Sequence, residues 1–323
     1  MDKGFRYGLL SFGMLAGVSA ATAIASAMLY RQTLPRPKGT SEDIIGQFAD
    51  AEKFEVYMKK MQPVADWGSG QKKEDVFITA RDGLRLHAFY IPSKKPCGRL
   101  VILHHGFTSN AMDNIIHAKF FHDLGYEVLL LDLRAHGQSE GRYVGFGILD
   151  RFDTLEWIRY AKERFGEDTK IVLHGTSMGG STVLMALGLD EVQKNVSAVI
   201  ADCAFTSPAM IFSHVMKQQY HVPVTNPIIR LNGLYSKAAA GYAFTDYSTL
   251  EALKNNEVPV LLIHGRKDRF VPVWMSEENF EACHSKKKLL LVDEAGHGSS
   301  IFEDPDLYQK TETEFLDEVF EEK

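Results

Sequence analysis

The sequence has 323 residues and a mass of 36.2 kDa; 45% of the residues are hydrophobic and 24% are charged. These are the proportions of an ordinary globular protein, and they exclude intrinsic disorder and low-complexity fibres. The formal net charge of −6 gives no reason to expect a nucleic-acid partner. The three cysteines, Cys97, Cys203 and Cys283, are too few and too scattered for a disulfide framework or a zinc site.

The first feature along the chain is a run of 24 residues without a charged side chain, from Tyr7 to Tyr30. As a helix it would be about 36 Å long, which exceeds the roughly 30 Å hydrocarbon core of a bilayer. We therefore predict a single-pass membrane anchor over residues 1–30, with the catalytic domain outside the cytoplasm. Basic residues flank both ends of the run, so the positive-inside rule barely constrains this orientation.

Cleavage of this segment as a signal peptide, followed by secretion, is the alternative to an anchor. Ala21-Thr22-Ala23 and Ala25-Ser26-Ala27 both have the A-x-A form of a cleavage site. The run is longer than the apolar stretch of roughly 7–15 residues in an ordinary signal peptide, and this favours the anchor.

Pro35 and Pro37 interrupt the first helix and begin a linker. Thr40 and Asp43 have the spacing of a capping box for a helix over about residues 41–61. We assign residues 31–73 to this linker and amphipathic helix, and we expect the helix to pack on the main domain.

From residue 74 onwards, short apolar runs alternate with helical stretches. Two strand signals flank Arg81-Asp82-Gly83, which has the composition of a hairpin turn. Later runs are continuously apolar, as expected of strands buried on both faces of a parallel sheet; they begin at about residues 100, 127, 170, 198, 259 and 288. Helices are predicted between them, near residues 112–124, 149–165, 178–189, 275–284 and 305–322. This order predicts an α/β domain over residues 74–323 with a doubly wound, mostly parallel sheet.

One interval interrupts this alternation of strands and helices. More than fifty residues separate the strand ending near Asp202 from the strand starting at Pro259, and they contain two helical stretches. An insertion at the carboxyl edge of a parallel sheet lies where ligands bind. We expect residues of about 205–250 to form a small helical cap over the site; a surface excursion without substrate contact is the alternative.

The sequence Gly175-Thr176-Ser177-Met178-Gly179 directly follows a predicted strand and opens a predicted helix. This is the setting of a nucleophile elbow, in which glycines permit a cramped turn that presents the serine hydroxyl. A bare G-x-S-x-G pattern is a weak signal, but between a strand and a helix it becomes a strong one. Ser177 is therefore the candidate nucleophile.

A serine nucleophile needs a general base, and the base needs an acid that orients it. His297 follows the last predicted strand and Asp268 follows the strand before it, at the same sheet edge as Ser177. The chain order Ser177, Asp268, His297 is the order expected on this type of sheet. Asp202, at the end of an earlier strand, is the rival candidate for the acid.

The oxyanion of a tetrahedral intermediate needs hydrogen-bond donors. One expected donor is the backbone N–H of Met178, immediately after the nucleophile. The other is the backbone N–H of Phe107, in the loop after the first parallel strand. Losing one such donor costs about 2.7–4 kcal/mol of transition-state stabilisation in other serine hydrolases.

Other residues with reactive side chains receive structural interpretations. No H-E-x-x-H motif is present, and we expect neither a metal nor another cofactor. Cys203 lies at a sheet edge, where we expect it to serve packing. Asp132 and Arg134 follow a strand, and we expect them to form a charge pair that holds their loop, with binding of an anionic substrate as the alternative.

Several of these motifs together resemble the α/β-hydrolase superfamily over about residues 75–320. They are His105-Gly106-Phe107, Asp132-Leu133-Arg134-Ala135-His136-Gly137, Gly175-Thr176-Ser177-Met178-Gly179, Asp268 and Gly296-His297. With its hydrophobic N-terminus and short cap, the chain is most similar to bacterial membrane-anchored hydrolases near the serine aminopeptidase and esterase branches. The resemblance implies the α/β-hydrolase fold, the triad and acyl-transfer chemistry, but no particular substrate. The oxyanion loop departs from the hormone-sensitive-lipase group, which has His-Gly-Gly-Gly where this chain has a single His-Gly.

We therefore predict a serine hydrolase that cleaves a carboxylic ester with a small or medium acyl group through an acyl-enzyme. A peptidase or aminoacyl amidase that uses the same triad on a short peptide is the first alternative. A non-catalytic anchored scaffold is the second, and the complete triad speaks against it. The expected partners are the small-molecule substrate and the membrane.

Overall fold

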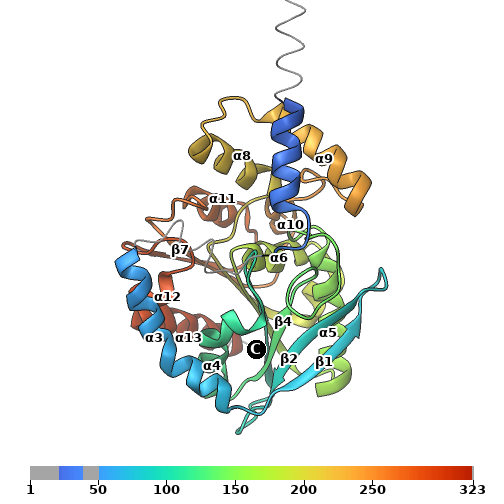
Figure 1. Ribbon diagram of the computed structural model, residues 1–323. Helices are drawn as coiled ribbons and strands as arrows, with labels where there is room; N and C mark the ends of the chain where they lie inside the picture. The colour runs from blue at the N-terminus through green and yellow to red at the C-terminus, as the bar shows by residue number, and fades with distance from the viewer. Residues whose placement is uncertain (1–21, 39–50, 322–323) are drawn as a thin grey trace, which may run out of the picture.

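The computed structural model describes residues 22–38 and 51–321, with side chains from residue 55 onwards in the second range (Figure 1). The first part of the predicted anchor and the predicted capping box at Thr40 and Asp43 lie outside these residues.

An eight-stranded sheet forms the centre of the molecule, in the order β1-β2-β4-β3-β5-β6-β7-β8. The strands are β1 (Glu74–Thr79), β2 (Arg85–Ile91), β3 (Arg99–His104), β4 (Glu127–Asp132), β5 (Lys170–Thr176), β6 (Val196–Asp202), β7 (Val260–Gly265) and β8 (Lys287–Val292). β2 is antiparallel to both β1 and β4, and the other neighbouring pairs are parallel. The predicted doubly wound, mostly parallel sheet is confirmed.

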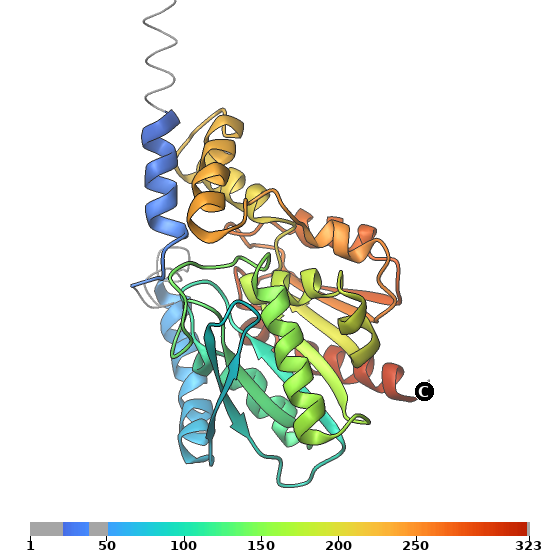
Figure 2. The ribbon, with the colours of Figure 1, turned by 90° about the vertical axis from the view of Figure 1, so that its right-hand side faces the viewer.

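Helices cover both faces of this sheet (Figures 1 and 2). One face carries α5 (Asp150–Phe165), α6 (Met178–Ala186), α7 (Asp190–Asn195), α10 (Thr249–Leu253) and α11 (Trp274–Ala282). The other face carries α3 (Ala51–Gly70), the short helix η1 (Ala111–Asn114), α4 (Ile115–Asp123), α12 (Ser300–Glu303) and α13 (Pro305–Glu321). Because the central strands are apolar throughout, each face of the sheet is buried under its own hydrophobic cluster.

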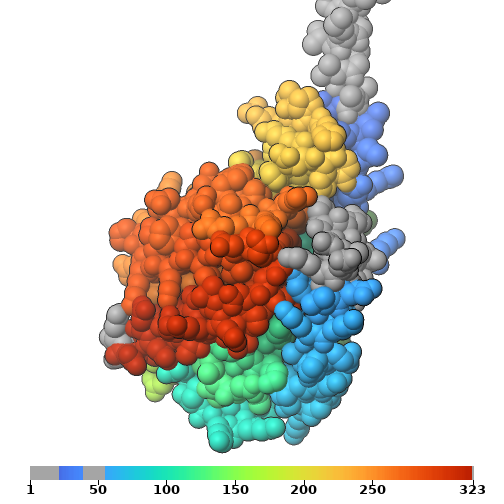
Figure 3. Space-filling view, turned by 90° about the vertical axis from the view of Figure 1, so that its left-hand side faces the viewer, coloured from blue at the N-terminus to red at the C-terminus, as the bar shows by residue number. Residues whose placement is uncertain are grey.

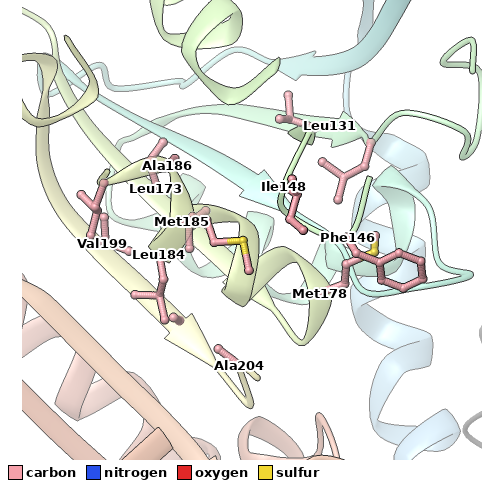
Figure 4. Packing of buried hydrophobic residues seen from close by; sticks show 14 of the residues in the cluster. Leu131, Phe146, Ile148, Leu173, Met178, Leu184, Met185, Ala186, Val199 and Ala204 are labelled. Atoms are coloured by element: carbon pink, nitrogen blue, oxygen red, sulfur yellow. The ribbon is translucent and has the colours of Figure 1, made fainter. Parts of the chain in front are cut away.

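The helix that follows Ser177 is anchored by one of these clusters. All nine residues of α6 are buried, because the helix lies between the sheet and the neighbouring α5 and α10. Figure 4 shows Met178, Leu184 and Met185 of α6 among the side chains of β5 and β6, including Leu173 and Val199. Burial of one such side chain stabilises the fold by about 1.5–3 kcal/mol. This packing holds the start of α6, and with it Ser177, in a fixed position at the carboxyl end of β5.

α3 continues beyond the sequence-predicted end of this helix at residue 61. It runs to Gly70 although Pro63 lies inside it, and a proline in a helix interior costs about 3 kcal/mol. Met61, Val64 and Trp67 pack on the hydrophobic cluster beside α4, and the Trp67 ring lies 5.2 Å from the ring of His122. This tertiary packing offsets the cost of the proline.

The interval between β6 and β7 forms α8 (Pro208–Gln219) and α9 (Asn226–Ala240) above the carboxyl edge of the sheet (Figure 1), and α10 follows them before β7. Ser207 caps α8, since its hydroxyl accepts a 3.2 Å hydrogen bond from the Met210 amide. α9 ends at Gly241, whose positive φ of 82° suits glycine at this position. We call residues 204–245 the cap.

Residues 22–33 form an N-terminal helix that lies beside α9 (Figures 1 and 2). Ser26 is fully buried there; its hydroxyl donates a 3.1 Å hydrogen bond to the Ile228 carbonyl, and its own carbonyl accepts one of 2.8 Å from the Asn232 amide. The second part of the predicted anchor therefore contacts the cap. No helix within residues 22–38 and 51–321 is long and apolar enough to cross a membrane.

Candidate active site

Ser177 occupies a strained turn between β5 and α6. Its backbone dihedrals are φ 56° and ψ −114°, a region that non-glycine residues rarely adopt. A backbone hydrogen bond to the neighbouring strand β6 stabilises the turn, since the Ser177 N–H donates a 2.8 Å hydrogen bond to the Asp202 carbonyl. The strain presents the hydroxyl at the carboxyl edge of the sheet, as a nucleophile elbow requires.

Two glycines permit this turn by close backbone approach. A Cβ on Gly175 would overlap the backbone of Gly179, and a Cβ on Gly179 would overlap the carbonyl of His104 on β3. Neither neighbour is a flexible side chain that moves aside. The pattern of glycines around Ser177 is thus a steric requirement of the turn.

The structure brings together the three side chains that the sequence places after β5, β7 and β8. His297 Nε2 lies 2.9 Å from Ser177 Oγ, and His297 Nδ1 lies 2.7 Å from Asp268 Oδ2. The Asp268 side chain is fully buried, whereas that of His297 is 17% exposed. The imidazole can therefore take a proton from the hydroxyl on one side while the carboxylate fixes its orientation on the other.

Asp268 is held as a carboxylate by several donors. Its Oδ1 accepts 2.9 Å hydrogen bonds from the N–H groups of Phe270 and Val271. Burial opposes ionisation, but the charge of His297 and hydrogen bonds from His264 and His297 hold the pKa of Asp268 well below its ordinary value. Burial likewise opposes protonation of His297, but the adjacent Asp268 carboxylate raises the pKa of His297 above its ordinary 6.5.

His264 is a member of this site that the sequence did not reveal. Its Nε2 lies 3.2 Å from Asp268 Oδ2 and 2.8 Å from the Val271 carbonyl, and its Nδ1 lies 2.7 Å from Ser276 Oγ. The ring is fully buried at the end of β7. The only signal in the sequence is its position four residues before Asp268. This spacing brings the two side chains together because the loop between them turns back on itself.

Asp202, the rival acid, has a different partner. Its Oδ2 accepts a 3.1 Å hydrogen bond from the Tyr308 hydroxyl, and burial raises the pKa of Asp202 to about 7. The next residue, Cys203, is fully buried, and burial raises the pKa of its thiol well above the ordinary value. A thiol in this state is a poor nucleophile.

The two predicted oxyanion donors flank Ser177. Met178 is the first residue of α6, where N–H groups have no partner within the helix. Gly106, directly before Phe107, lies so close to the elbow that a Cβ on it would be 3.6 Å from Ser177 Cβ. Both predicted donors thus belong to segments that lie next to Ser177.

Neutral histidines support the loop that carries Phe107. His136 Nε2 accepts a 3.2 Å hydrogen bond from the Thr108 N–H, and His105 Nε2 accepts one of 3.0 Å from the Leu133 N–H. Burial lowers the pKa of His136 to about 3, so the ring remains an uncharged acceptor at neutral pH. These contacts tie the loop after β3 to the loop after β4.

The predicted charge pair between Asp132 and Arg134 is wrong. Arg134 instead makes a bidentate ion pair with Asp153 of α5, at 2.6 and 2.7 Å, and both side chains are buried. Asp132 Oδ2 lies 2.8 Å from Nδ1 of His87 on β2. Asp132 is the last residue of β4 and Arg134 lies in the loop that follows it, and the two side chains reach different partners there.

Two groups within residues 22–38 and 55–321 bring three potential metal ligands together. One is His117, His174 and Glu312, all buried under the face of the sheet that carries α13; the other is Cys203, Asp268 and His297. In the second group Asp268 and His297 already bind one another. Neither group assigns a cofactor to the site.

Aromatic rings connect the site to the cap. The Phe107 ring lies 5.3 Å from the ring of Phe146, which lies 5.0 Å from that of Phe212 on α8. Phe212 and Phe146 both contact Phe244 at the end of the cap. An apolar wall therefore extends from the oxyanion loop to α8.

This fold and site define the class of protein. A family described as the alpha/beta hydrolase fold matches residues 99–227, which include β3, β5 and the elbow at Ser177. Together with the sheet order and the turn geometry, this match supports the α/β-hydrolase superfamily as the class of this chain.

Individual relatives resemble the chain over most of its length. The uncharacterized protein YqkD of Bacillus subtilis is 28% identical over 314 residues, covering 96% of this chain and 97% of its own. The alpha/beta hydrolase domain-containing protein WAV2 of Arabidopsis thaliana is 27% identical over 263 residues, or 77% of this chain and 80% of its own. Among solved structures, the Pyrococcus furiosus esterase Pf2001 superposes with a TM-score of 0.62 at 26% identity, covering 80% of this chain and 93% of its own.

Proposed function

We propose that this chain is a serine carboxylesterase that works through an acyl-enzyme intermediate. The observation that carries the proposal is the continuous hydrogen-bonded series from Ser177 Oγ through the His297 ring to Asp268, starting at a strained elbow. The likeness to the Pyrococcus furiosus esterase supports ester substrates.

In the first half-reaction, Ser177 Oγ attacks the ester carbonyl carbon while His297 Nε2 takes the hydroxyl proton. The N–H groups of Phe107 and Met178 stabilise the oxyanion of the tetrahedral intermediate. Its collapse breaks the bond to the alcohol oxygen, which receives the proton from His297. Asp268 keeps the imidazole in the tautomer that can accept this proton.

In the second half-reaction, water takes the place of the alcohol. His297 removes a proton from the water as it attacks the acyl-enzyme, and then returns the proton to Ser177 Oγ as the acid leaves. The aromatic wall of Phe107, Phe146 and Phe212 beside the oxyanion loop favours an apolar acyl group.

The test compares the protein with its Ser177→Ala variant on p-nitrophenyl esters of rising acyl length and on aminoacyl anilides. We expect ester turnover that falls by about 10⁴–10⁶-fold in the variant. Comparable turnover of the anilides would instead indicate the peptidase. Equal inertness of both folded proteins would contradict catalysis and favour the scaffold.

We further propose that the N-terminal segment attaches this domain to the cell membrane from its extracytoplasmic side. The part of the uncharged run from Tyr7 to Ile24, which precedes Ala25 and the buried Ser26, has 18 residues and would be about 27 Å long as a helix. That length lies within the range of short membrane spans. Signal cleavage after Ala27 would remove Ser26 and its two hydrogen bonds to α9, which argues against cleavage at this site, whereas cleavage after Ala23 would leave them in place. Mass spectrometry of the membrane fraction tests this, since an intact N-terminus is expected.

A further inference from the structure

Large exposed hydrophobic side chains are concentrated at one end of the molecule. Twelve are found in residues 22–38 and 55–321, and seven of these lie on the N-terminal helix and the cap, which make up about a fifth of that part of the chain. The seven are Ile24, Met28, Met210, Tyr220, Val224, Leu234 and Tyr235. A concentration of exposed apolar side chains at one end of a folded protein is typical of an interaction site.

The N-terminal helix and the cap present these side chains from one end of the fold. Ile24 and Met28 are four residues apart and share the outer face of the helix. On the same helix Ser26 is bonded to α9, and the ring of Tyr30 lies 6.4 Å from that of Tyr235. In Figure 3 the yellow part of the cap and the dark blue N-terminal helix stand together above the rest of the domain.

The charge of these two segments is opposite to that of the whole protein. Residues 22–38 and the cap contain six lysines and arginines and no aspartate or glutamate, whereas the rest of the chain carries a net charge of −12. The six are Arg31, Arg36, Lys38, Lys217, Arg230 and Lys237, and all are exposed. Lys237 pairs with Asp246, and Arg36 bonds to backbone carbonyls. The other four are available to an external anion.

We propose that this surface, which we call the docking face, binds an anionic lipid bilayer; this inference rests on the proposed esterase function and membrane attachment. Apolar side chains flanked by lysine and arginine are the composition of protein surfaces that lie in the headgroup region. Basic residues at an anionic membrane surface each contribute about 1 kcal/mol. The uncharged run that begins at Tyr7 includes the N-terminal helix, which lies at this same end (Figure 1).

Docking in this orientation places the cap between the bilayer and the catalytic residues. The cap covers the carboxyl edge of the sheet, and Phe212 of α8 connects through Phe146 to Phe107 beside Ser177. A docked enzyme would therefore have its site near esters that partition into the membrane, and we expect such esters to be its substrates.

Docking is measured on the full chain carrying Ser177→Ala and Cys97→Ser, so that no catalysis is needed and the exposed native thiol is absent. An environment-sensitive fluorophore is attached at Leu234→Cys on α9, and in a matched protein at Leu124→Cys. Leu124 is 41% exposed and follows α4, at the sheet edge opposite the cap. In phosphatidylcholine–phosphatidylglycerol vesicles we expect a blue shift and quenching by brominated lipid at position 234 only. Equal, water-like emission from both positions would overturn the proposal.

The role of charge is measured with Lys217→Gln combined with Arg230→Gln. Removing two charges worth about 1 kcal/mol each shifts the docking equilibrium by roughly 30-fold. Lys94→Gln with Lys95→Gln, in the loop after β2 at the other end, is the matched control and is expected to change nothing. We call the protein with Lys217→Gln and Arg230→Gln the cap variant. If it docks as well as the control, the requirement for an anionic surface is contradicted.

Kinetics with Ser177 intact separate this inference from the proposed function. We expect the cap variant to slow hydrolysis of an ester carried in anionic vesicles and to leave hydrolysis of p-nitrophenyl acetate in solution unchanged. Docking without hydrolysis of any ester would refute only the esterase, while hydrolysis without docking would refute only the docking face.

Discussion

The side-chain amide of Asn232 in α9 donates a 2.8 Å hydrogen bond to the backbone carbonyl of Ser26, across 206 residues of sequence. Both residues are fully buried. This contact joins the N-terminal helix to the cap, so the segment that leads to the proposed anchor is packed on the cap.

Asn232→Ala is expected to loosen the N-terminal helix. The substitution leaves the buried Ser26 carbonyl without its donor, which costs about 1–3 kcal/mol of folding free energy. Trypsin cleavage at the exposed Arg31 is therefore expected to accelerate, and the urea midpoint to fall. Gln218→Ala, at an exposed position of α8, is the control; equal cleavage of the two variants would contradict the structural role of the contact.

Asp268→Asn is expected to reduce kcat on a soluble ester by about 10⁴-fold, because the amide stabilises the wrong tautomer of His297. Asp202→Asn is the matched variant, since Asp202 contacts Tyr308 and not the imidazole ring. It is expected to retain most of the rate. A larger loss from Asp202→Asn than from Asp268→Asn would identify Asp202 as the acid.

The pH dependence of kcat/KM follows from the raised pKa of His297. The general base must be neutral, so the rate is expected to fall as the pH decreases through this pKa, with an inflection above 6.5. Removing the negative charge in Asp268→Asn moves the inflection of the residual activity to lower pH. A profile whose inflection is the same in both proteins would show that another group controls the rate.

Gly179→Ala is expected to prevent folding or to destabilise the protein by several kcal/mol, since the new Cβ overlaps the His104 backbone. Gly233→Ala provides the contrast. That glycine lies inside α9, and its Cβ would be 3.5 Å from Ala243 Cβ, an ordinary contact. Because alanine favours the helix more than glycine does, this substitution should stabilise the protein by up to about 1 kcal/mol. Thermal unfolding distinguishes the two outcomes.

Gly265→Ala tests the loop that carries Asp268. A Cβ at this position would overlap the backbone of Ala295, in the loop that carries His297. We expect lower activity together with lower stability, because the two loops can no longer approach. Gly70→Ala, with open space around it at the end of α3, is the control for a neutral exchange.

The sequence by itself was sufficient to predict the parallel sheet and the positions of the candidate site residues along the chain. Continuous apolar runs identify buried strands such as β5 and β7 because burial on both faces leaves no polar positions. The glycines around Ser177 are recognisable because the sterics of a tight turn are local. The positions of Asp268 and His297 follow from the rule that parallel strands end at one edge.

Only the tertiary structure decided which apolar residues are covered and by what. The run from Tyr7 to Tyr30 reads as one uninterrupted hydrophobic segment, yet Ser26 is buried against the cap while Ile24 and Met28 face outwards. The sequence predicts the end of this helix at about residue 61, whereas α3 continues through Pro63 to Gly70 and packs on α4. The contact of His264 with Asp268 likewise depends on how their loop turns. The hydrophobic effect is non-directional. A sequence therefore shows that apolar residues favour burial, but it does not show which distant part of the chain buries them.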